Sequence, residues 1–273
     1  MDQYVASPEA LTRIAARIAL AAGDRIYELR RRGVAVAALK SSAVDMVTEA
    51  DQEAERMIVS ALLAERPDDG VLGEEGSNTE GTSGITWIID PIDGTTNYFY
   101  DIPAYAVSIA ATVADPEWSN ERFRTIAGAV YNPSTRELFE AWEGGGARLN
   151  GDAIAPSGTA DPAVSLVGTG FGYTVERKVE QLEMVQRLLP RVRDLRRIGS
   201  AAYDLCLVAC GRLDAYYERG LNAWDYAAGM LIAKEAGAAV IGRDPLTPPG
   251  TEMLYAASPG LAENLRAIAT GTE

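Results

Sequence analysis

The sequence contains no histidine, and it has only two cysteines among its 273 residues. The absence of histidine excludes nucleophiles that need a histidine base, histidine-ligated zinc and phosphohistidine chemistry. Any catalysis must therefore use carboxylates, hydroxyls, lysine, backbone groups or a metal held by oxygen ligands. The two cysteines, Cys206 and Cys210, stand four residues apart in a predicted helix, a spacing that favours free thiols over a disulfide.

Positive charge is also scarce, because 25 Lys and Arg stand against 39 Asp and Glu, for a formal net charge of -14. Binding to nucleic acid or to an anionic membrane needs a basic face, so we expect neither partner. No run approaches about 18 consecutive apolar residues, so no membrane-spanning helix is expected. The first residues lack the pattern of a secretory signal, and with the two thiols this predicts a cytoplasmic protein.

Apolar residues are plentiful at 47%, enough for a large core, and their spacing indicates the first elements. Residues 9–32 carry them at three- and four-residue steps, which is typical of a helix. A second helix is predicted after Thr48, which has the spacing of a capping box with Asp51. Strand-like runs then follow one another, at 105–113, 125–131 and 137–142. This order predicts an antiparallel sheet flanked by the two helices.

The second half of the chain alternates between strands and helices instead. A strand over 164–170 precedes a helix over 175–189, and the same alternation continues to a closing helix after Pro259. Alternation of this kind predicts an α/β lobe. The change falls near 146–160. We therefore expect residues 1–148 to form an α+β lobe and residues 149–273 to form an α/β lobe.

The segment WIIDPIDGTTN, residues 87–97, ends an apolar strand in two aspartates. Asp90 lies at the strand end, and Asp93 follows a bend fixed by Pro91, so the two carboxylates can converge. The carbonyl of Ile92 can face the same point. Converging carboxylates repel one another unless a cation neutralises them. Without histidine, a hard cation such as Mg²⁺ is the natural occupant.

Gly94, Thr95 and Thr96 follow the aspartates directly. They predict the start of a helix or a tight turn, where exposed backbone N–H groups and hydroxyls can bind an anion. A cation beside a phosphate site is the arrangement that phosphoryl transfer requires. The alternative is an ordinary capped helix after a β-turn, for which Asp-Gly and Asn are also typical.

Two further segments place acidic residues at the ends of predicted elements. Glu74 and Glu75 lie between glycines in GEEG, and Asp225 stands at the start of a helix in NAWDYAAG. Alone, the first is typical of a solvated turn and the second of a helix cap. Their combination with Asp90 and Asp93 is what indicates a metal site.

Together these motifs resemble the inositol monophosphatase family, in particular its bacterial branch that hydrolyses inositol-1-phosphate. The resemblance covers about residues 40–240 and rests on five segments: DMVTEAD, GEEG, WIIDPIDGTTN, RIGSAAYDLCLVACGRLDAYYE and WDYAAG. It implies the layered α-β-α-β-α sandwich of the inositol monophosphatase and fructose-1,6-bisphosphatase type. It also implies a homodimer that hydrolyses a small phosphate monoester with Mg²⁺, with the metal site in the first lobe and the second lobe completing the active site.

The resemblance assigns a role to each acidic residue. It implies that two or three Mg²⁺ ions are held by Glu74, Asp90, the Ile92 carbonyl, Asp93 and Asp225. Asp90 would bridge two ions, and Asp93 would serve the leaving-group end of the reaction. Asp51 and Thr95 match the pair that orients the attacking water.

The resemblance also implies substrate contacts. Beside the phosphate-binding residues Gly94, Thr95 and Thr96, these are the turn Gly199, Ser200 and Ala201 and the carboxylate of Glu218. Lys40 matches a mobile loop, although a solvated loop lysine is the alternative there.

Two alternatives to an inositol phosphatase stay open. The same chemistry can act on histidinol phosphate, fructose-1,6-bisphosphate or a 3′-phosphonucleotide, which Glu218 and the 199–201 turn disfavour. A non-catalytic binding protein is the second alternative, which the complete set of metal-ligand residues disfavours.

Overall fold

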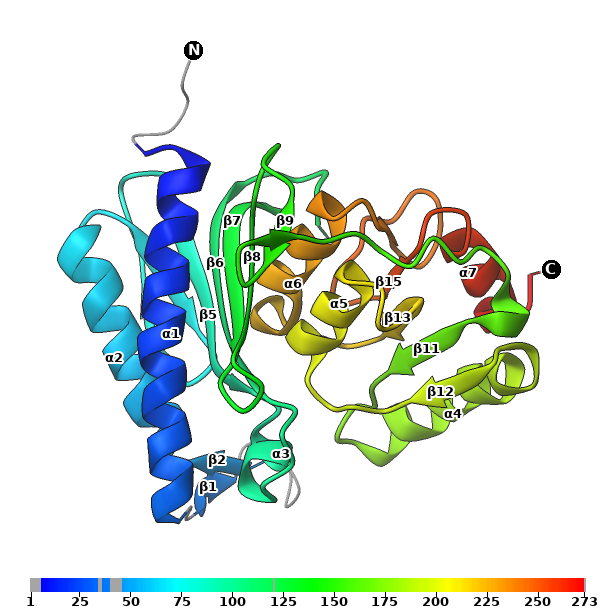
Figure 1. Ribbon diagram of the computed structural model, residues 1–273, viewed down its shortest axis with the longest axis horizontal. Helices are drawn as coiled ribbons and strands as arrows, with labels where there is room; N and C mark the ends of the chain where they lie inside the picture. Colours follow the sequence, from blue (N-terminus) through cyan, green and yellow to red (C-terminus); the bar gives the residue numbers. More distant parts are fainter. Residues whose placement is uncertain (1–5, 34–35, 40–45, 120, 273) are drawn as a thin grey trace.

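The computed structural model describes residues 6–33, 36–39, 46–119 and 121–272, and at 36–39 and 46–47 only their backbone. These residues form five layers, in which helices cover both outer faces of two sheets and also separate the sheets (Figure 1). The predicted α-β-α-β-α sandwich is therefore confirmed. The predicted mobile-loop residue Lys40 lies outside the described residues.

The first helical layer consists of α1 (Pro8–Arg32) and α2 (Glu49–Glu65). Ser7 caps α1 by accepting the N–H of Ala10, and the apolar stripe of the helix buries Leu11, Ile18 and Ile26. Each such side chain contributes about 1.5–3 kcal/mol when fully buried. The predicted capping box at Thr48 begins α2, so both helices form where the sequence places them.

The first sheet has eight strands in the order β10-β9-β8-β7-β6-β5-β3-β4. The strands are β3 (Gly70–Gly73), β4 (Asn78–Thr79), β5 (Thr86–Asp93), β6 (Ala106–Ala114), β7 (Phe123–Asn132), β8 (Glu137–Trp142), β9 (Ala147–Leu149) and β10 (Asp152–Ala153). Side chains of β5 alternate between its two faces, since Trp87 and Ile89 pack toward α1 and α2 while Ile88 packs on the opposite side.

The prediction of an antiparallel first sheet is wrong at one pair, because β3 and β5 run parallel. The chain leaves β3 through the short hairpin to β4 and then returns on the other side of β3 to form β5. The hydrophobic pattern alone cannot predict this return, because the intervening turn-rich residues contain no signal for direction. A short sheet of β1 (Val36–Leu39) and β2 (Met46–Thr48) and the helix α3 (Thr95–Phe99) lie at one end of this lobe (Figure 1).

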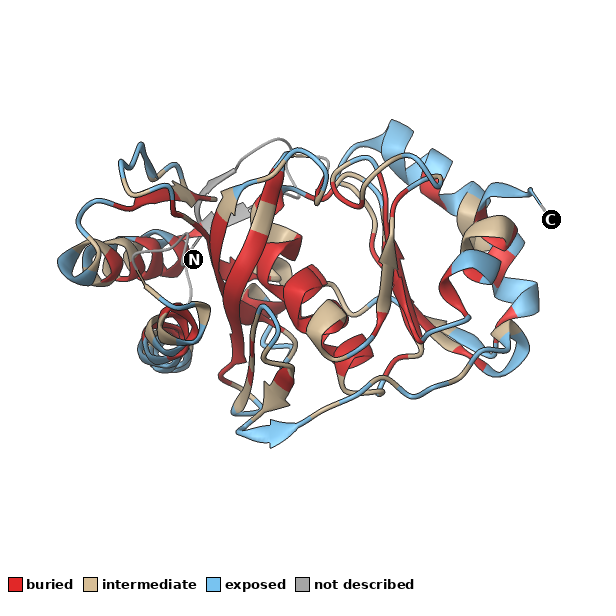
Figure 2. Cartoon of the chain, turned by 90° about the horizontal axis from the view of Figure 1, so that it is seen from above, coloured by how far each residue is buried: buried red, intermediate tan, exposed pale blue. Residues whose placement is uncertain are grey.

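The middle layer consists of α5 (Ala201–Ala209) and α6 (Ala223–Glu235), which lie between the sheets and are the most buried helices seen in Figure 2. Small residues permit the close packing here. A side-chain carbon on Gly229 would lie 2.9 Å from Cβ of Leu205 and 3.0 Å from the carbonyl oxygen of Ala202. A carbon on Gly128 of β7 would lie 3.2 Å from Cα of Ala228.

The second sheet has the order β12-β11-β13-β15-β14. Its strands are β11 (Leu166–Thr169), β12 (Asp194–Arg196), β13 (Ala215–Glu218), β14 (Ala239–Ile241) and β15 (Leu254–Ala257). The outer layer is α4 (Val175–Leu188) and α7 (Ala262–Thr270), with single 3₁₀ turns at 162–164 and 189–191. Parallel pairs join β11 to its two neighbours, and β15 runs antiparallel to both of its own.

The first sheet extends to β10, beyond the boundary placed at residue 148, and the division into two lobes stays a prediction. None of the helices in the described part of the chain is both long enough and apolar enough to cross a membrane.

The close packing of the middle layer predicts that Gly229→Val destabilises the protein. Added carbons meet the α5 backbone, and overpacking of this kind costs about 1–3 kcal/mol. Denaturant unfolding measures the change. Ala21→Val on the exposed side of α1 is the control, and it should lower the free energy of unfolding by no more than about 0.7 kcal/mol. Equal effects of the two substitutions would contradict this account of the layer.

Candidate metal centre and active site

A cleft of about 490 Å³ opens where the end of β5 meets the first turns of α5 and α6. Most of the predicted site residues line it: Glu74, Asp90, Ile92, Asp93, Gly94, Thr95, Thr96, Gly199, Ser200, Ala201, Glu218 and Asp225. Asp51 reaches the cleft through Thr95, as described below. The structure therefore brings together residues from both lobes, while their chemical roles stay predictions.

The C-terminal end of β5 places its two aspartates at the cleft. The regular pairing of β5 with β6 is interrupted between Asp90, which pairs with Ser108, and Asp93, which pairs with Ala106. Within this bulge an oxygen of Asp90 accepts the backbone N–H of Ile92 at 3.0 Å. A bulge re-aims side chains that a regular strand would turn to opposite faces. As a result, both carboxylates face the interior of the cleft.

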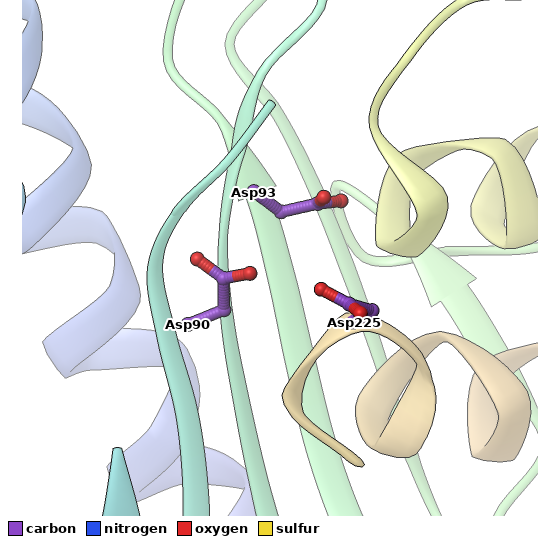
Figure 3. A group of neighbouring side chains, drawn as sticks. All are labelled: Asp90, Asp93 and Asp225. Carbon is purple, nitrogen blue, oxygen red and sulfur yellow. The ribbon is translucent and has the colours of Figure 1, made fainter. Parts of the chain in front are cut away.

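A third carboxylate approaches from α6. Asp225 closes a capping box by accepting the N–H of Asn222 at 2.6 Å, so the start of the helix fixes its orientation. One oxygen each of Asp90, Asp93 and Asp225 lies within 4.8 Å of the others. Figure 3 shows the three carboxylates facing the same space between β5 and α6. This spacing suits oxygen ligands around a cation.

Asp93 is held by the beginning of α5. Its carboxylate accepts hydrogen bonds from the hydroxyl of Ser200 at 2.7 Å and from the N–H groups of Ala201 at 3.2 Å and Ala202 at 2.7 Å. The positive end of a helix stabilises a negative charge at this position. Burial, together with the charge of Glu74, nevertheless raises the pKa of Asp93 to about 6 against these hydrogen bonds.

The same causes act on the other acidic residues. Burial raises the pKa of Asp90 well above its ordinary value, and the charges of Glu74, Asp93 and Asp225 add to the effect. Burial and the charge of Glu74 likewise raise the pKa of Asp225. A divalent cation bound here would offset both the burial of these carboxylates and their mutual repulsion.

Thr95 connects the cleft to α2. Its hydroxyl lies 3.2 Å from an oxygen of Asp51 and 3.1 Å from the carbonyl oxygen of Ile92. The other oxygen of Asp51 accepts the N–H of Thr48 at 2.8 Å in the capping box. Asp51 is buried, so the N-terminus of α2 positions it without exposing it to solvent. The hydroxyl of Thr95 is therefore placed to pass a proton to Asp51.

The turn at Gly199 packs directly against the start of α3. The side-chain amide of Asn97 donates to the carbonyl oxygens of Ala104 at 2.7 Å and Ile198 at 2.8 Å. Gly94 has a φ of 93°, and a side-chain carbon there would lie 3.0 Å from the carbonyl oxygen of Gly199. Glycine is needed at position 94 for both reasons. This contact joins the two predicted substrate segments into one wall of the cleft.

Glu218 enters the opposite wall from the end of β13. It accepts a hydrogen bond from the Tyr216 hydroxyl, and Gly170 leaves it space, since a side-chain carbon there would overlap its carboxylate. Burial raises the pKa of Glu218 to about 7, although Tyr216 and Arg197 oppose the shift. Near neutral pH this carboxyl group can both accept and donate hydrogen bonds to hydroxyl groups.

Sequence reasoning missed several residues at the site. Arg177 lines the cleft, and Glu55 binds the GEEG turn from α2. Asp204 is buried in α5 with one oxygen unpaired among the described residues, and burial raises its pKa well above the usual value. Two signals were present: Glu55 stands four residues after Asp51, and Asp204 interrupts the apolar run AAYDLCLVA.

Comparison with known proteins gives consistent results. A sequence profile of the inositol monophosphatase family matches residues 7–272. Inositol-1-monophosphatase of Mycobacterium bovis is 45% identical over 237 residues, covering 84% of this chain and 79% of the relative. Nus factor SuhB of Vibrio cholerae is 39% identical over 229 residues, covering 83% of each.

Solved structures agree with this result. The crystal structure of extragenic suppressor protein suhB from Bartonella henselae has a TM-score of 0.87 and 31% identity, covering 95% of this chain and 98% of that one. The similarity in sequence and fold thus extends over nearly the whole chain.

The raised pKa values predict how pH affects the metal-free protein. A carboxyl group whose pKa is higher in the folded state binds more protons there, so its stabilising effect is complete below its unfolded pKa and is lost as pH rises through its folded pKa. For Asp93 and Glu218 the loss begins above the unfolded pKa and is complete above about pH 6 and about pH 7 respectively. With chelator present, we expect the melting temperature to be at least about 2–4 °C higher near pH 5.5 than near pH 8, the equivalent of about 1 kcal/mol.

The control for this prediction is Asp225→Asn, which keeps an oxygen for the N–H of Asn222 but removes one negative charge. This variant should melt at a higher temperature than the wild type near pH 8 and depend less on pH. A metal-free wild type that becomes steadily more stable from about pH 5.5 to 8 would contradict the assigned repulsion.

Proposed function

Because the chain belongs to the inositol monophosphatase family, we propose that it is a Mg²⁺-dependent phosphatase that hydrolyses inositol-1-phosphate to inositol and phosphate. The observation that carries the proposal is the convergence of Asp90, Asp93 and Asp225 in one cleft. Family membership supports phosphatase activity in general. The choice of Mg²⁺ and of this substrate is our inference from the residues of the cleft.

The donor set fits a hard divalent cation. All of its groups are oxygen ligands, and two of the three clustered aspartates, Asp90 and Asp93, are buried. The raised pKa values of Asp90 and Asp93 reflect repulsion and burial that positive charge would offset. Asp90, Asp93 and Asp225 would hold the cation, with Glu74 and the Ile92 carbonyl beside them, and the family resemblance implies two or three ions. Mg²⁺ bound here supplies activation of water and neutralisation of phosphate charge.

Residues of the chain itself then transfer the proton and bind the phosphate ester. Thr95 accepts a proton from the attacking water as its own hydroxyl proton passes to Asp51, which lies 3.2 Å away. The water oxygen forms a bond to phosphorus as the bond to the alcohol oxygen breaks, and the released alkoxide takes a proton from solvent. The backbone N–H groups of Gly94, Thr95 and Thr96 hold the phosphate oxygens.

Substrate choice is assigned to the opposite wall. Glu218, with a pKa of about 7, can bond a pair of neighbouring hydroxyls of a cyclic polyol, and the turn 199–201 lines the same cleft. This feature favours inositol-1-phosphate over histidinol phosphate, fructose-1,6-bisphosphate or a 3′-phosphonucleotide. Substrates without adjacent hydroxyls would leave Glu218 with only the Tyr216 hydroxyl as its hydrogen-bond partner among the described residues.

Phosphate release from these four compounds, with Mg²⁺ and with chelator, tests the proposal. We expect inositol-1-phosphate to give the highest kcat/KM, and only with Mg²⁺. Asp93→Asn should lower kcat/KM by about 100-fold or more, because it removes a charge from the metal site. Glu218→Gln should impair inositol-1-phosphate more than the rival substrates.

The result that would overturn the substrate assignment is faster turnover of any rival compound. Full activity of Asp93→Asn would overturn the metal chemistry. A binding role is the second candidate function, since the Vibrio cholerae relative is named a Nus factor. A cellular phenotype that Asp93→Asn rescues without restoring phosphatase activity would support that role.

We further propose that the protein is a cytoplasmic homodimer. The free thiols of Cys206 and Cys210 are compatible with a reducing compartment. Apolar side chains remain exposed along one face of α4, where Val175, Val179 and Leu182 follow at helical spacing and are 71%, 56% and 48% exposed. A second copy covering this face would remove them from water.

Light scattering after size exclusion tests the homodimer. We expect twice the chain mass for the wild type and a shift toward monomer in Val179→Glu, because a charge in an apolar contact is unfavourable. Glu183→Gln on the same helix should leave the mass unchanged. A wild-type monomer at micromolar concentration would contradict the proposal.

A further inference from the structure

Glu55 is a buried carboxylate for which the proposed reaction has no role. It lies in α2 with only 3% of its surface exposed. It stands four residues after Asp51, and residues at that spacing share one face of a helix. The same face of α2 therefore carries the proposed proton acceptor and, one turn later, a second acidic group.

The carboxylate of Glu55 binds the GEEG turn through the backbone. One oxygen accepts the N–H of Glu75 at 2.7 Å, and the other accepts the N–H of Ser77 at 2.9 Å. The turn is closed independently, because the N–H of Gly73 donates to the carbonyl oxygen of Ser77 at 2.7 Å. Backbone N–H groups that converge on a carboxylate form a concave anion site.

Glycine is needed at two positions of this turn, and the physical reason differs between them. A side-chain carbon on Gly73 would lie 2.5 Å from an oxygen of Glu55, so glycine is needed for the close approach of the carboxylate. Gly76 has a φ of 105°, which favours glycine on its own. The turn is thus shaped to receive Glu55, and Glu74 lies between the glycine that Glu55 contacts and the N–H that it accepts.

A buried carboxylate is a costly way to stabilise a hairpin that its own backbone already closes. No ion pair of Glu55 with Arg or Lys occurs among the described residues, so its two backbone donors provide the compensation. Glu74 meanwhile lines the cleft and acts electrostatically on Asp90 and Asp225. The orientation of Glu74 depends on the turn, and Glu55 holds that turn.

We propose that Glu55 is a positioning residue that fixes the GEEG turn so that Glu74 faces the cation site, an inference that rests on the proposed metal-dependent function. Outer groups that orient a metal ligand contribute substantially to metal affinity. Since α2 also holds Asp51 against Thr95, one helix sets both the proton acceptor and a ligand of the cation.

The test measures Mg²⁺ binding directly, by calorimetry on chelator-treated protein. Glu55→Gln places an NH₂ group against a backbone donor, and Gly73→Ala pushes the carboxylate away without changing charge. We expect each substitution to weaken Mg²⁺ binding by about 10–100-fold. The Mg²⁺ concentration for half-maximal phosphatase activity should rise by the same factor, and kcat at saturating Mg²⁺ should recover most of its wild-type value.

The matched control is Glu53→Gln, the same chemical change on the same helix. Glu53 accepts from Arg25 and makes no described contact with the turn. The Glu53→Gln variant should bind Mg²⁺ with an affinity within about twofold of that of the wild type. If Gly73→Ala and a folded Glu55→Gln bind Mg²⁺ as tightly as the wild type and only melt at lower temperature, Glu55 is structural and the proposal falls. A wild type that binds no Mg²⁺ would instead overturn the proposed function itself.

Discussion

The repulsion among Asp90, Asp93 and Asp225 is the constraint on which the rest of the site depends. In water such groups would separate, but here three different elements hold them within reach of one another. The bulge in β5 turns Asp90 toward the cleft, and the start of α5 binds Asp93 through three hydrogen bonds. The capping box of α6 fixes the orientation of Asp225. The folded core supplies the free energy for this arrangement, which is typical of functional sites.

The residues proposed for the chemistry and the residue proposed for substrate selectivity come from different parts of the molecule. The acidic cluster and the Thr95–Asp51 pair belong to the end of β5, the first turn of α6 and the start of α2. Glu218 comes from β13 in the second sheet. The two groups lie across the cleft from one another and are coupled electrostatically, because, in addition to burial, the charge of Asp93 raises the pKa of Glu218 and the charge of Glu218 raises that of Asp225.

Much of the fold could be predicted because it depends on local pattern. The helical period of residues 9–32, the capping box at Thr48 and the small residues after Asp93 each determine structure within a few neighbours. The parallel pairing of β3 with β5 could not, because strand direction depends on how the chain returns through a turn with no directional signal.

The site shows the same division. The strand that ends in Asp90 and Asp93 is visible in the sequence, as are Glu74 and Asp225 at the ends of predicted elements, and the family resemblance assigns a role to each. Glu55 could not be predicted, because its hydrogen-bond partners are the backbone N–H groups of Glu75 and Ser77, far along the chain. Asp204 could not be predicted, because one of its oxygens has no hydrogen-bond partner among the described residues. A glutamate in an ordinary amphipathic helix carries no mark of the backbone groups that it will meet after folding.

The shared middle layer has a consequence for how the protein comes apart. All of α5 and most of α6 are buried, with one sheet on either side, so neither sheet keeps a complete core when the other is lost. A chain with two independent domains often departs from two-state unfolding. Here the loss of either sheet would expose the apolar surface of the same two helices. We therefore expect the chain to melt as a single cooperative unit, with its slowest amide exchange in α5 and α6.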